Sequence, residues 1–315
     1  MPKIVIIGAG AVGTTLAYTL QVSGLMTELV LVDVDQQKAK GEVMDMQHGL
    51  FFVPPVKITA GDYTDCAGAD MVVVTAGARQ RVGESRLDLI GRNTKIVTEI
   101  IGQIVEQTTD AVILMITNPV DVLTYIGQRH AGLRPGQLFG SGTVLDSARF
   151  RYLVSQHCRV DPRNVHAYVM GEHGDSEVLI WSLVSIAGVP LETYCLQAGC
   201  EYTQAVRQQI TVTVRESAYH VIQAKGATNF AVSLAARRII ETVLRDEHSV
   251  LTVSTQLTEQ YGLTGVCLSA PCIVGRSGIV QILECPLTDE EMTELKHSAD
   301  VLRTIQRQVI SSAVV

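Results

Sequence analysis

Short apolar runs alternate with amphipathic stretches through the first half of the chain. The apolar runs, each compatible with a buried strand, occupy residues 3–7, 28–32, 56–60, 71–74, 112–116 and 138–140. Between them, apolar positions spaced three or four residues apart predict helices at 11–23, 36–48, 86–107, 119–131 and 142–157. Strands that alternate with helices in this way are typical of a parallel sheet. The pattern therefore predicts an α/β fold with a doubly wound parallel sheet.

The pattern changes after about residue 160. Strands are predicted at 165–169 and 178–186, helices at 201–224 and 229–246, a strand meander over 249–283 and a last helix from about 288. Elements that are grouped rather than alternating are typical of an α+β unit. A chain of 315 residues is long for one core. We therefore expect two sub-domains packed together, residues 1–142 and residues 143–315.

A glycine-rich turn follows the first apolar run directly. The segment Gly8-Ala9-Gly10-Ala11-Val12-Gly13 follows a strand-like run and opens a helical pattern. In such a turn Gly8 permits the tight bend, Gly10 lets the backbone approach a pyrophosphate, and Gly13 allows close helix packing. The first turn of the helix, which includes Val12, offers free N–H groups to the anion. The segment predicts a Rossmann-type dinucleotide-binding site.

An acidic residue follows the second strand. Asp33 lies 20 residues after Gly13, which is about the spacing of the carboxylate that binds the adenosine ribose. A carboxylate accepts hydrogen bonds from a ribose 2′-hydroxyl but repels a 2′-phosphate, so NAD is favoured over NADP as the cofactor. Asp35 could share this role, and the residues alone leave the choice open.

Composition excludes several classes of protein. The formal net charge is −7 and the pI is near 5.6, so a nucleic-acid partner is not expected. The apolar runs are too short to span a bilayer, and the first strand leaves no room for a signal peptide, so we expect a cytoplasmic protein without a membrane partner. Seven cysteines without CxxC pairs or zinc-type histidine spacing predict reduced thiols and no metal site.

Four polar segments carry the candidate chemistry. They are Thr75–Arg86, Ile116–Pro119, Leu145–Arg151 and Met170–Ser176. With these motifs in this order, the chain resembles the L-lactate/malate dehydrogenase family over nearly its whole length, and within it the bacterial L-lactate dehydrogenases. The resemblance implies reversible hydride transfer between NADH and pyruvate to give (S)-lactate. It also implies cofactor contacts from Thr75, Ala76, Gly77 and Asn118, beside those of the glycine turn.

His173 is the predicted proton carrier. It lies between Gly171 and Gly174, and histidine is the side chain whose usual pKa suits proton exchange near neutral pH. The resemblance implies that Asp146 accepts a hydrogen bond from its ring and stabilises the imidazolium. Asp175 is nearer in sequence, and sequence alone does not exclude it as the partner.

Arginines are predicted to hold and polarise the substrate. Asp146 and Arg149 are three residues apart on one predicted helix, so both face the same way, and a guanidinium can bind a carboxylate through two parallel hydrogen bonds. The resemblance implies that Arg149 binds the substrate carboxylate and that Arg86 polarises the reacting carbonyl after cofactor and substrate bind in order and the loop closes. It also places Asn118 near the substrate oxygen and Thr228 near its methyl group.

The choice of oxo acid is expected to depend on Gln80. Related malate dehydrogenases carry arginine at this position to pair the second carboxylate of oxaloacetate, whereas glutamine supplies no charge. An unpaired buried anion costs several kcal/mol, so pyruvate is favoured. Arg81 is one residue away and keeps malate dehydrogenase activity open as an alternative. A non-catalytic NAD-binding protein would be expected to lack at least one of four residues, and none is missing: Arg86, Asp146, Arg149 and His173.

Two further residues suggest regulation. Arg151 follows Arg149 by two positions, so it points to roughly the opposite side of the helix and cannot serve the same substrate. The resemblance implies that Arg151 and His166 bind the phosphates of fructose 1,6-bisphosphate across a subunit interface. Because the first predicted strand begins almost at residue 1, we expect the protein to lack the N-terminal arm that looks typical of vertebrate relatives. We expect a homo-oligomer, a tetramer, formed by other contacts and activated by this ligand.

Overall fold

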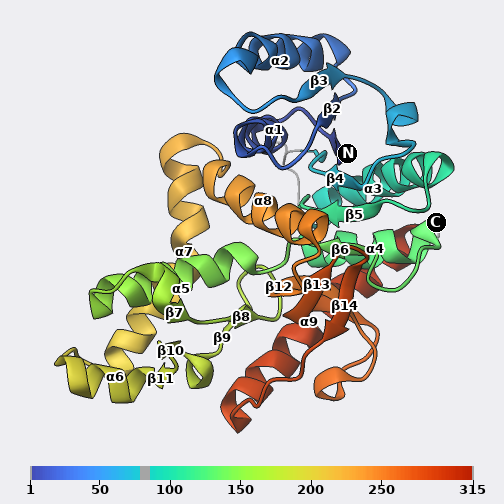
Figure 1. Ribbon diagram of the computed structural model, residues 1–315. Helices are drawn as coiled ribbons and strands as arrows, with labels where there is room; N and C mark the ends of the chain where they lie inside the picture. The colour runs from blue at the N-terminus through green and yellow to red at the C-terminus, as the bar shows by residue number, and fades with distance from the viewer. Residues whose placement is uncertain (1, 79–85, 314–315) are drawn as a thin grey trace.

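The computed structural model describes residues 2–78 and 86–313 (Figure 1). Its largest sheet contains β1 (Lys3–Ile7), β2 (Glu28–Val32), β3 (Lys57–Ala60), β4 (Met71–Val74), β5 (Val112–Met115), β6 (Leu138–Gly140), β12 (Ser249–Leu257), β13 (Val266–Gly275) and β14 (Gly278–Ile282). The helices are α1 (Ala11–Ser23), α2 (Gln36–His48), α3 (Arg86–Gln107), α4 (Val120–Ala131), α5 (Val144–Cys158), α6 (Leu191–Ala198), α7 (Gln204–Lys225), α8 (Phe230–Arg245) and α9 (Asp289–Ala313).

The order of the strands in this sheet is β14-β13-β12-β6-β5-β4-β1-β2-β3. Strands β1 to β6 are parallel and reverse their order between β1 and β4, which is the doubly wound arrangement predicted from the sequence. Strand β12 pairs antiparallel with β6 through Ser254 and Gly140, so the second half of the chain extends the sheet of the first.

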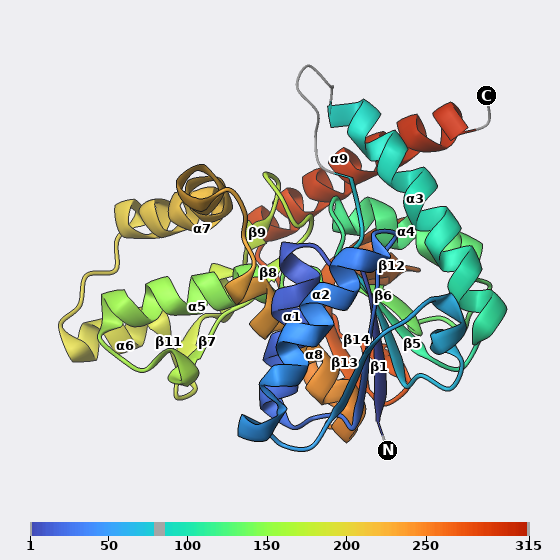
Figure 2. The ribbon, with the colours of Figure 1, turned by 90° about the horizontal axis from the view of Figure 1, so that it is seen from above.

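The parallel strands are buried on both faces, which explains their uninterrupted apolar sequences. On one face Ile4 and Leu29 pack in a core with residues of α1, α2 and α8, and on the other Val5 and Val30 pack with residues of α3 and α4. Figure 2 shows these two helical layers on opposite sides of the sheet. The candidate site is therefore expected beyond the carboxyl ends of the parallel strands, where the loops after β1, β2, β4 and β5 lie.

The remaining strands are shorter than the sequence predicted. The predicted strands 165–169 and 178–186 are wrong in extent: the structure has β7 (Val165–His166), β8 (Val169–Met170), β9 (Val178–Leu179), β10 (Ser185–Ile186) and β11 (Val189–Pro190). A 3₁₀ turn at Trp181–Leu183 separates β9 from β10. Helix α6 was not predicted. No helix in the described ranges is long and apolar enough to cross a membrane.

Candidate active site

Two positions of the glycine turn after β1, Gly8 and Gly13, accept only glycine. Gly8 has φ of +115°, and a Cβ there would lie 2.7 Å from the backbone nitrogen of Ala76. A Cβ on Gly13 would lie 1.8 Å from the carbonyl oxygen of Gly8. A Cβ on Gly10 would meet no atom within 4 Å, and no side chain caps the N-terminus of α1 at this residue. The first turn of α1, with Val12, thus presents its N–H groups beside open space, as a pyrophosphate requires.

Asp33 lies against this turn. Its Oδ2 accepts a hydrogen bond from the backbone N–H of Ala9 at 2.6 Å, and its Oδ1 accepts one from the N–H of Asp35 at 2.9 Å. The side chain of Asp35 instead caps α2 by accepting a hydrogen bond from the N–H of Lys38 at 3.0 Å. Of the two carboxylates left open by the sequence, Asp33 is the one bonded to the glycine turn. The uncapped start of α1 and the open space at Gly10 fit the pyrophosphate of a dinucleotide. The carboxylate of Asp33 fits a ribose with a free 2′-hydroxyl.

The loops after β4 and β5 are tied together by a residue that the sequence analysis missed. Asn93 of α3 accepts a hydrogen bond from the N–H of Ala78 at 2.7 Å and donates one to the carbonyl oxygen of Asn118 at 3.1 Å. In the first of these loops Thr75 donates a hydrogen bond to the carbonyl oxygen of Gly8 at 3.0 Å. A Cβ on Gly77 would lie 2.4 Å from the side chain of Thr117, so the two loops pack closely.

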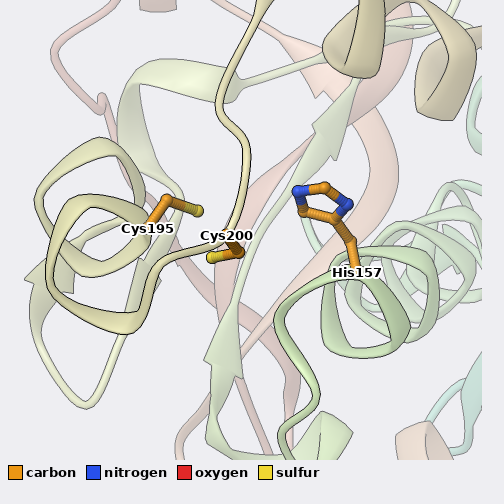
Figure 3. Close-up of side chains that lie close together, drawn as sticks. All are labelled: His157, Cys195 and Cys200. Carbon is orange, nitrogen blue, oxygen red and sulfur yellow. The ribbon is translucent and has the colours of Figure 1, made fainter.

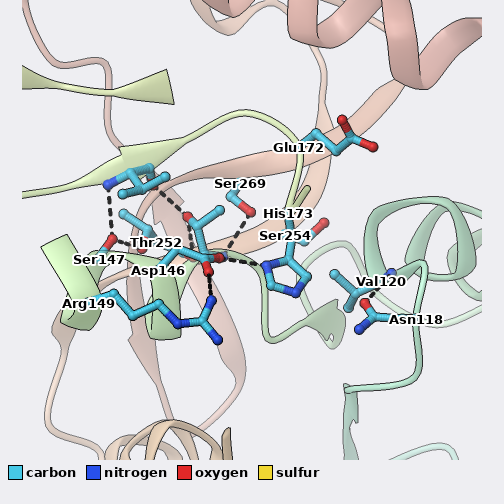
Figure 4. A network of polar contacts seen from close by, with 12 residues as sticks. Asn118, Val120, Asp146, Ser147, Arg149, Glu172, His173, Thr252, Ser254 and Ser269 are labelled. Atoms are coloured by element: carbon cyan, nitrogen blue, oxygen red, sulfur yellow. Dashed lines mark hydrogen bonds and ion pairs between the residues drawn. The ribbon is translucent and has the colours of Figure 1, made fainter. Parts of the chain in front are cut away.

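The centre of the site is a chain of three polar side chains (Figure 4). The ring Nδ1 of His173 donates a hydrogen bond to Oδ2 of Asp146 at 2.6 Å, and Nη1 of Arg149 donates one to Oδ1 of the same carboxylate at 2.6 Å. The alternative partner, Asp175, accepts a hydrogen bond from the hydroxyl of Tyr219 at 2.7 Å. In the view of Figure 4, Asn118 lies on the far side of the His173 ring from Asp146.

The same arrangement leaves Arg149 able to bind an anion. A guanidinium has five N–H donors, and the carboxylate of Asp146 contacts only the Nη1 nitrogen of Arg149 in the ion pair. The side chain of Arg149 is 17% exposed whereas that of Asp146 is 2% exposed. The ion pair therefore fixes the guanidinium at the edge of the buried pair without covering it.

Opposing effects set the pKa values of this pair. Burial alone would lower the pKa of His173, but the charge of Asp146 and its hydrogen bond to the ring outweigh burial and raise it to about 9. Burial also favours the neutral form of Asp146, yet the charges and hydrogen bonds of His173 and Arg149 hold its pKa below the usual value. The pair is therefore an imidazolium beside a carboxylate at neutral pH.

A second missed residue, Asp121, positions the loop that carries His173. Its Oδ2 accepts a hydrogen bond from the backbone N–H of His173 at 2.7 Å, and its Oδ1 accepts one from the hydroxyl of Ser254 at 2.5 Å. Burial raises the pKa of Asp121 to about 6. Because Asp121 binds the backbone and not the ring, it holds the loop in place whichever side chain stands at position 173. The sequence offered one signal for this role, which is that Asp121 follows the candidate residue Asn118 by three positions.

The other predicted residues lie in different settings. Gln80 and Arg81 lie outside the described residues, and so does the side chain of Arg86, whose backbone begins α3. Thr228 lies between α7 and α8, and its neighbour Asn229 donates a hydrogen bond to Thr15 of α1 at 2.9 Å. This segment is therefore held against the helix that follows the glycine turn.

Arg151 has different contacts from Arg149, as their spacing predicted. Its Nε donates a hydrogen bond to the carbonyl oxygen of Ala167 at 3.0 Å, and its guanidinium lies 5.3 Å from the centre of the Tyr168 ring. Burial lowers the pKa of Arg151. His166 is exposed on β7, directly before Ala167. The two residues of the predicted regulatory pair thus come from adjoining segments.

The glycine turn, the ribose-side carboxylate and the histidine–aspartate pair together define an NAD-dependent oxidoreductase. Residues 2–140 match the family model for the lactate/malate dehydrogenase NAD-binding domain, and residues 143–312 match the model for the α/β C-terminal domain of the same family. The chain belongs to the lactate/malate dehydrogenase family.

Individual relatives are similar over nearly their whole length. The chain is 52% identical to an L-lactate dehydrogenase of Acetivibrio thermocellus over 303 residues, 96% of each chain. It is 50% identical to one of Thermoanaerobacter pseudethanolicus over 309 residues, 98% of this chain and 99% of the relative. Among solved structures, the minor L-lactate dehydrogenase of Enterococcus mundtii is similar with a TM-score of 0.95 and 35% identity, covering 98% of both chains. A lactate dehydrogenase from a Medee basin deep-sea metagenome has the same TM-score and coverage at 37% identity.

Proposed function

We propose that the protein is an L-lactate dehydrogenase that interconverts pyruvate and (S)-lactate. The hydrogen-bonded pair of His173 and Asp146, with Arg149 paired to the same carboxylate, carries this proposal. A 2-oxo acid needs one cation for its carboxylate and one proton for its carbonyl oxygen, and this arrangement supplies both. The relatives named L-lactate dehydrogenase support the choice of substrate.

In the proposed mechanism each side chain has one task. The glycine turn, Asp33 and the loops at Thr75–Gly77 and Asn118 would hold NADH, which would supply the hydride. Arg149 binds the pyruvate carboxylate through its remaining donors and fixes the orientation of the carbonyl. His173 gives the proton on its Nε2 to the carbonyl oxygen, while Asp146 keeps Nδ1 protonated and stabilises the imidazolium beforehand.

Three more residues complete the proposed substrate site. Arg86 polarises the carbonyl, Thr228 lies beside the methyl group, and the uncharged Gln80 leaves no partner for a second carboxylate. These roles follow the family resemblance of the sequence. The alternative substrate pair is oxaloacetate and malate, with Arg81 as the cation for the second carboxylate.

The test of this function is the oxidation of NADH with pyruvate and with oxaloacetate in parallel. We expect kcat/KM for pyruvate to be larger by about 100-fold or more, because oxaloacetate would bury a carboxylate without a partner. A preference for oxaloacetate would contradict the proposal and identify a malate dehydrogenase. No activity with either substrate, in protein that binds NADH, would favour a non-catalytic NAD-binding protein.

We further propose that fructose 1,6-bisphosphate activates a cytoplasmic homotetramer through Arg151 and His166. Arg151 lines a cavity of about 410 Å³ that Arg238 also lines, and its Nε donates a hydrogen bond to the carbonyl oxygen of Ala167, the residue that follows His166. If such pairs are repeated at a two-fold interface, the bisphosphate would bind the assembled, active form more tightly than the unassembled form. It would thereby stabilise the active form.

Activation by the bisphosphate is expected to lower the KM for pyruvate, and more so at acid pH, because an imidazolium binds phosphate better than an imidazole. Pyruvate saturation curves with and without the bisphosphate, measured at acid and neutral pH, check this. Arg151→Gln should abolish the effect, whereas His220→Ala, a change at an exposed histidine of α7, should not. Curves that the bisphosphate leaves unchanged at both pH values would remove the proposal.

A further inference from the structure

A histidine and three cysteines gather at the end of α5 farthest from Asp146. A nitrogen of His157 and the sulfurs of Cys195 and Cys200 all lie within 4.8 Å of one another. The sulfur of Cys158 lies 3.9 Å from that of Cys195. Figure 3 shows that the first three side chains converge from three segments: His157 from α5, Cys195 from α6 and Cys200 from the chain just after α6.

From this cluster we propose a structural metal site for a zinc-class ion, bound by His157, Cys195 and Cys200 and completed by Cys158. A tetrahedral Zn²⁺ has Zn–S bonds of about 2.3 Å, which places two sulfurs on one ion about 3.8 Å apart. The separation of Cys158 and Cys195 is 3.9 Å. This one sulfur–sulfur separation therefore matches that of two ligands on a zinc ion, and the ligand atoms of His157, Cys195 and Cys200 lie within 4.8 Å of one another.

The kinds of donor select the class of metal. Thiolates and imidazole are soft or intermediate ligands that favour Zn²⁺ over Ca²⁺ or Mg²⁺, which prefer carboxylate and carbonyl oxygens. Four protein ligands leave no open coordination position, which is typical of a structural site and not of a catalytic one. His157 also lies about three turns, or about 16 Å, along α5 from Asp146. The proposed ion therefore takes no part in hydride or proton transfer.

The backbone around α6 holds the two later cysteines in place. Gly199 ends α6 in the left-handed conformation, with φ of 68°, and its N–H bonds to the carbonyl oxygen of Cys195. The N–H of Cys200 bonds to the same oxygen at 3.1 Å. This turn brings Cys200 back beside Cys195. The geometry thus follows from the helix end and not from the metal.

Metal binding would replace the proton of each cysteine ligand. A metal binds cysteine as the thiolate, so each cysteine of the cluster must lose its proton when the ion binds. The Nε2 of His157 lies 2.5 Å from the carbonyl oxygen of Glu201 and donates its proton there. When the ion binds, each S–H releases its proton to solvent as a sulfur–metal bond forms, whereas the neutral imidazole binds through its unprotonated ring nitrogen and releases no proton.

The site would join three segments of the second half of the chain. Helix α5 carries Asp146 and Arg149 near its first turn and His157 and Cys158 in its last. The ion would fix that end of α5 to α6 and to the segment that leads into α7. Binding to the folded form alone raises stability according to the ion concentration and its Kd.

Titration of the reduced, metal-free full-length protein with Co²⁺ tests the proposal. We expect a single ion per chain, an absorption spectrum of tetrahedral cobalt with thiolate ligands, and loss of that spectrum when Zn²⁺ is added. Zn²⁺ should also raise the Tm. Cys200→Ser and His157→Gln, both at half-buried positions, should each weaken binding by about 100-fold or more, since even outer contacts of metal sites are worth 10–100-fold.

Cys285→Ser is the matched control, because Cys285 is a half-buried thiol outside the cluster. It should bind Co²⁺ as the unmodified protein does. The proposal is overturned if the cobalt–thiolate spectrum is missing, or if Cys200→Ser and His157→Gln titrate like the control. A Cys158–Cys195 disulfide that persists in protein treated with reductant would overturn it as well. None of these outcomes depends on the activity with pyruvate.

Discussion

Replacing His173 with asparagine is expected to lower kcat for pyruvate reduction by about 10²–10⁴-fold while leaving the Kd for NADH unchanged. Asparagine cannot carry the proton that the carbonyl oxygen must receive. The loop should keep its place, because Asp121 binds the backbone N–H of residue 173 and not its ring. Steady-state kinetics together with NADH fluorescence titration separates the two effects. A variant that loses NADH binding as well would place the role of His173 in folding or cofactor binding.

The pH dependence of the unmodified enzyme provides the companion measurement. Reduction consumes the imidazolium of His173, whose pKa is raised to about 9, so kcat/KM for pyruvate should stay level through neutral pH and fall as pH rises through about 9. Asp146→Asn removes the charge that outweighs burial, so the fall should move to lower pH and kcat should decrease. If the falling limb stays in place, Asp146 does not set the protonation of His173.

Replacing Gln80 with arginine is expected to raise the ratio of kcat/KM for oxaloacetate to that for pyruvate by roughly 100-fold. The new guanidinium would pair the second carboxylate of oxaloacetate, whose burial without a partner costs about 3 kcal/mol. Gln80 lies outside the described residues, so this expectation follows from the sequence. The measurement is NADH oxidation by both substrates under identical conditions.

Arg81→Gln is the control for this substitution. It keeps the length of the loop and removes the neighbouring cation that could serve oxaloacetate instead. If Gln80→Arg leaves the ratio unchanged while Arg81→Gln lowers it, the loop presents residue 81 to the substrate. In that case the assignment of Gln80 to the substrate site is wrong.

The sequence predicted the parallel sheet well because its strands are buried on both faces. Such strands appear as continuous apolar runs, and the predicted strands 3–7, 28–32 and 71–74 agree with β1, β2 and β4. The two-residue strands of the second half are too short to show any periodicity, so 165–169 and 178–186 were predicted as longer strands. Helix α6 has eight residues, about two turns, and gives a similarly weak pattern.

Residues that act through side-chain chemistry were easier to predict than residues that act through the backbone. His173 and Asp146 were named from motifs, and their hydrogen bond agrees with the predicted pairing. Asn93 and Asp121 were missed because they bind main-chain atoms of segments far away in sequence. The cluster of His157 and the cysteines was missed for a related reason: its members span three segments, so their spacing resembles no zinc motif.

The pairing of β12 with β6 has a consequence for how the chain acquires its structure. Residues 2–140 by themselves would leave β6 as an open edge, with unpaired backbone groups that invite association with another chain. Its neighbour in the sheet is joined at Ser254, so the ribosome must synthesise more than a hundred further residues before that edge can be covered. Contacts so distant in sequence slow folding, and a nascent chain would carry the exposed strand throughout this interval. The nucleotide-binding half is therefore synthesised first, but its sheet is completed only after β12 of the second half has been synthesised.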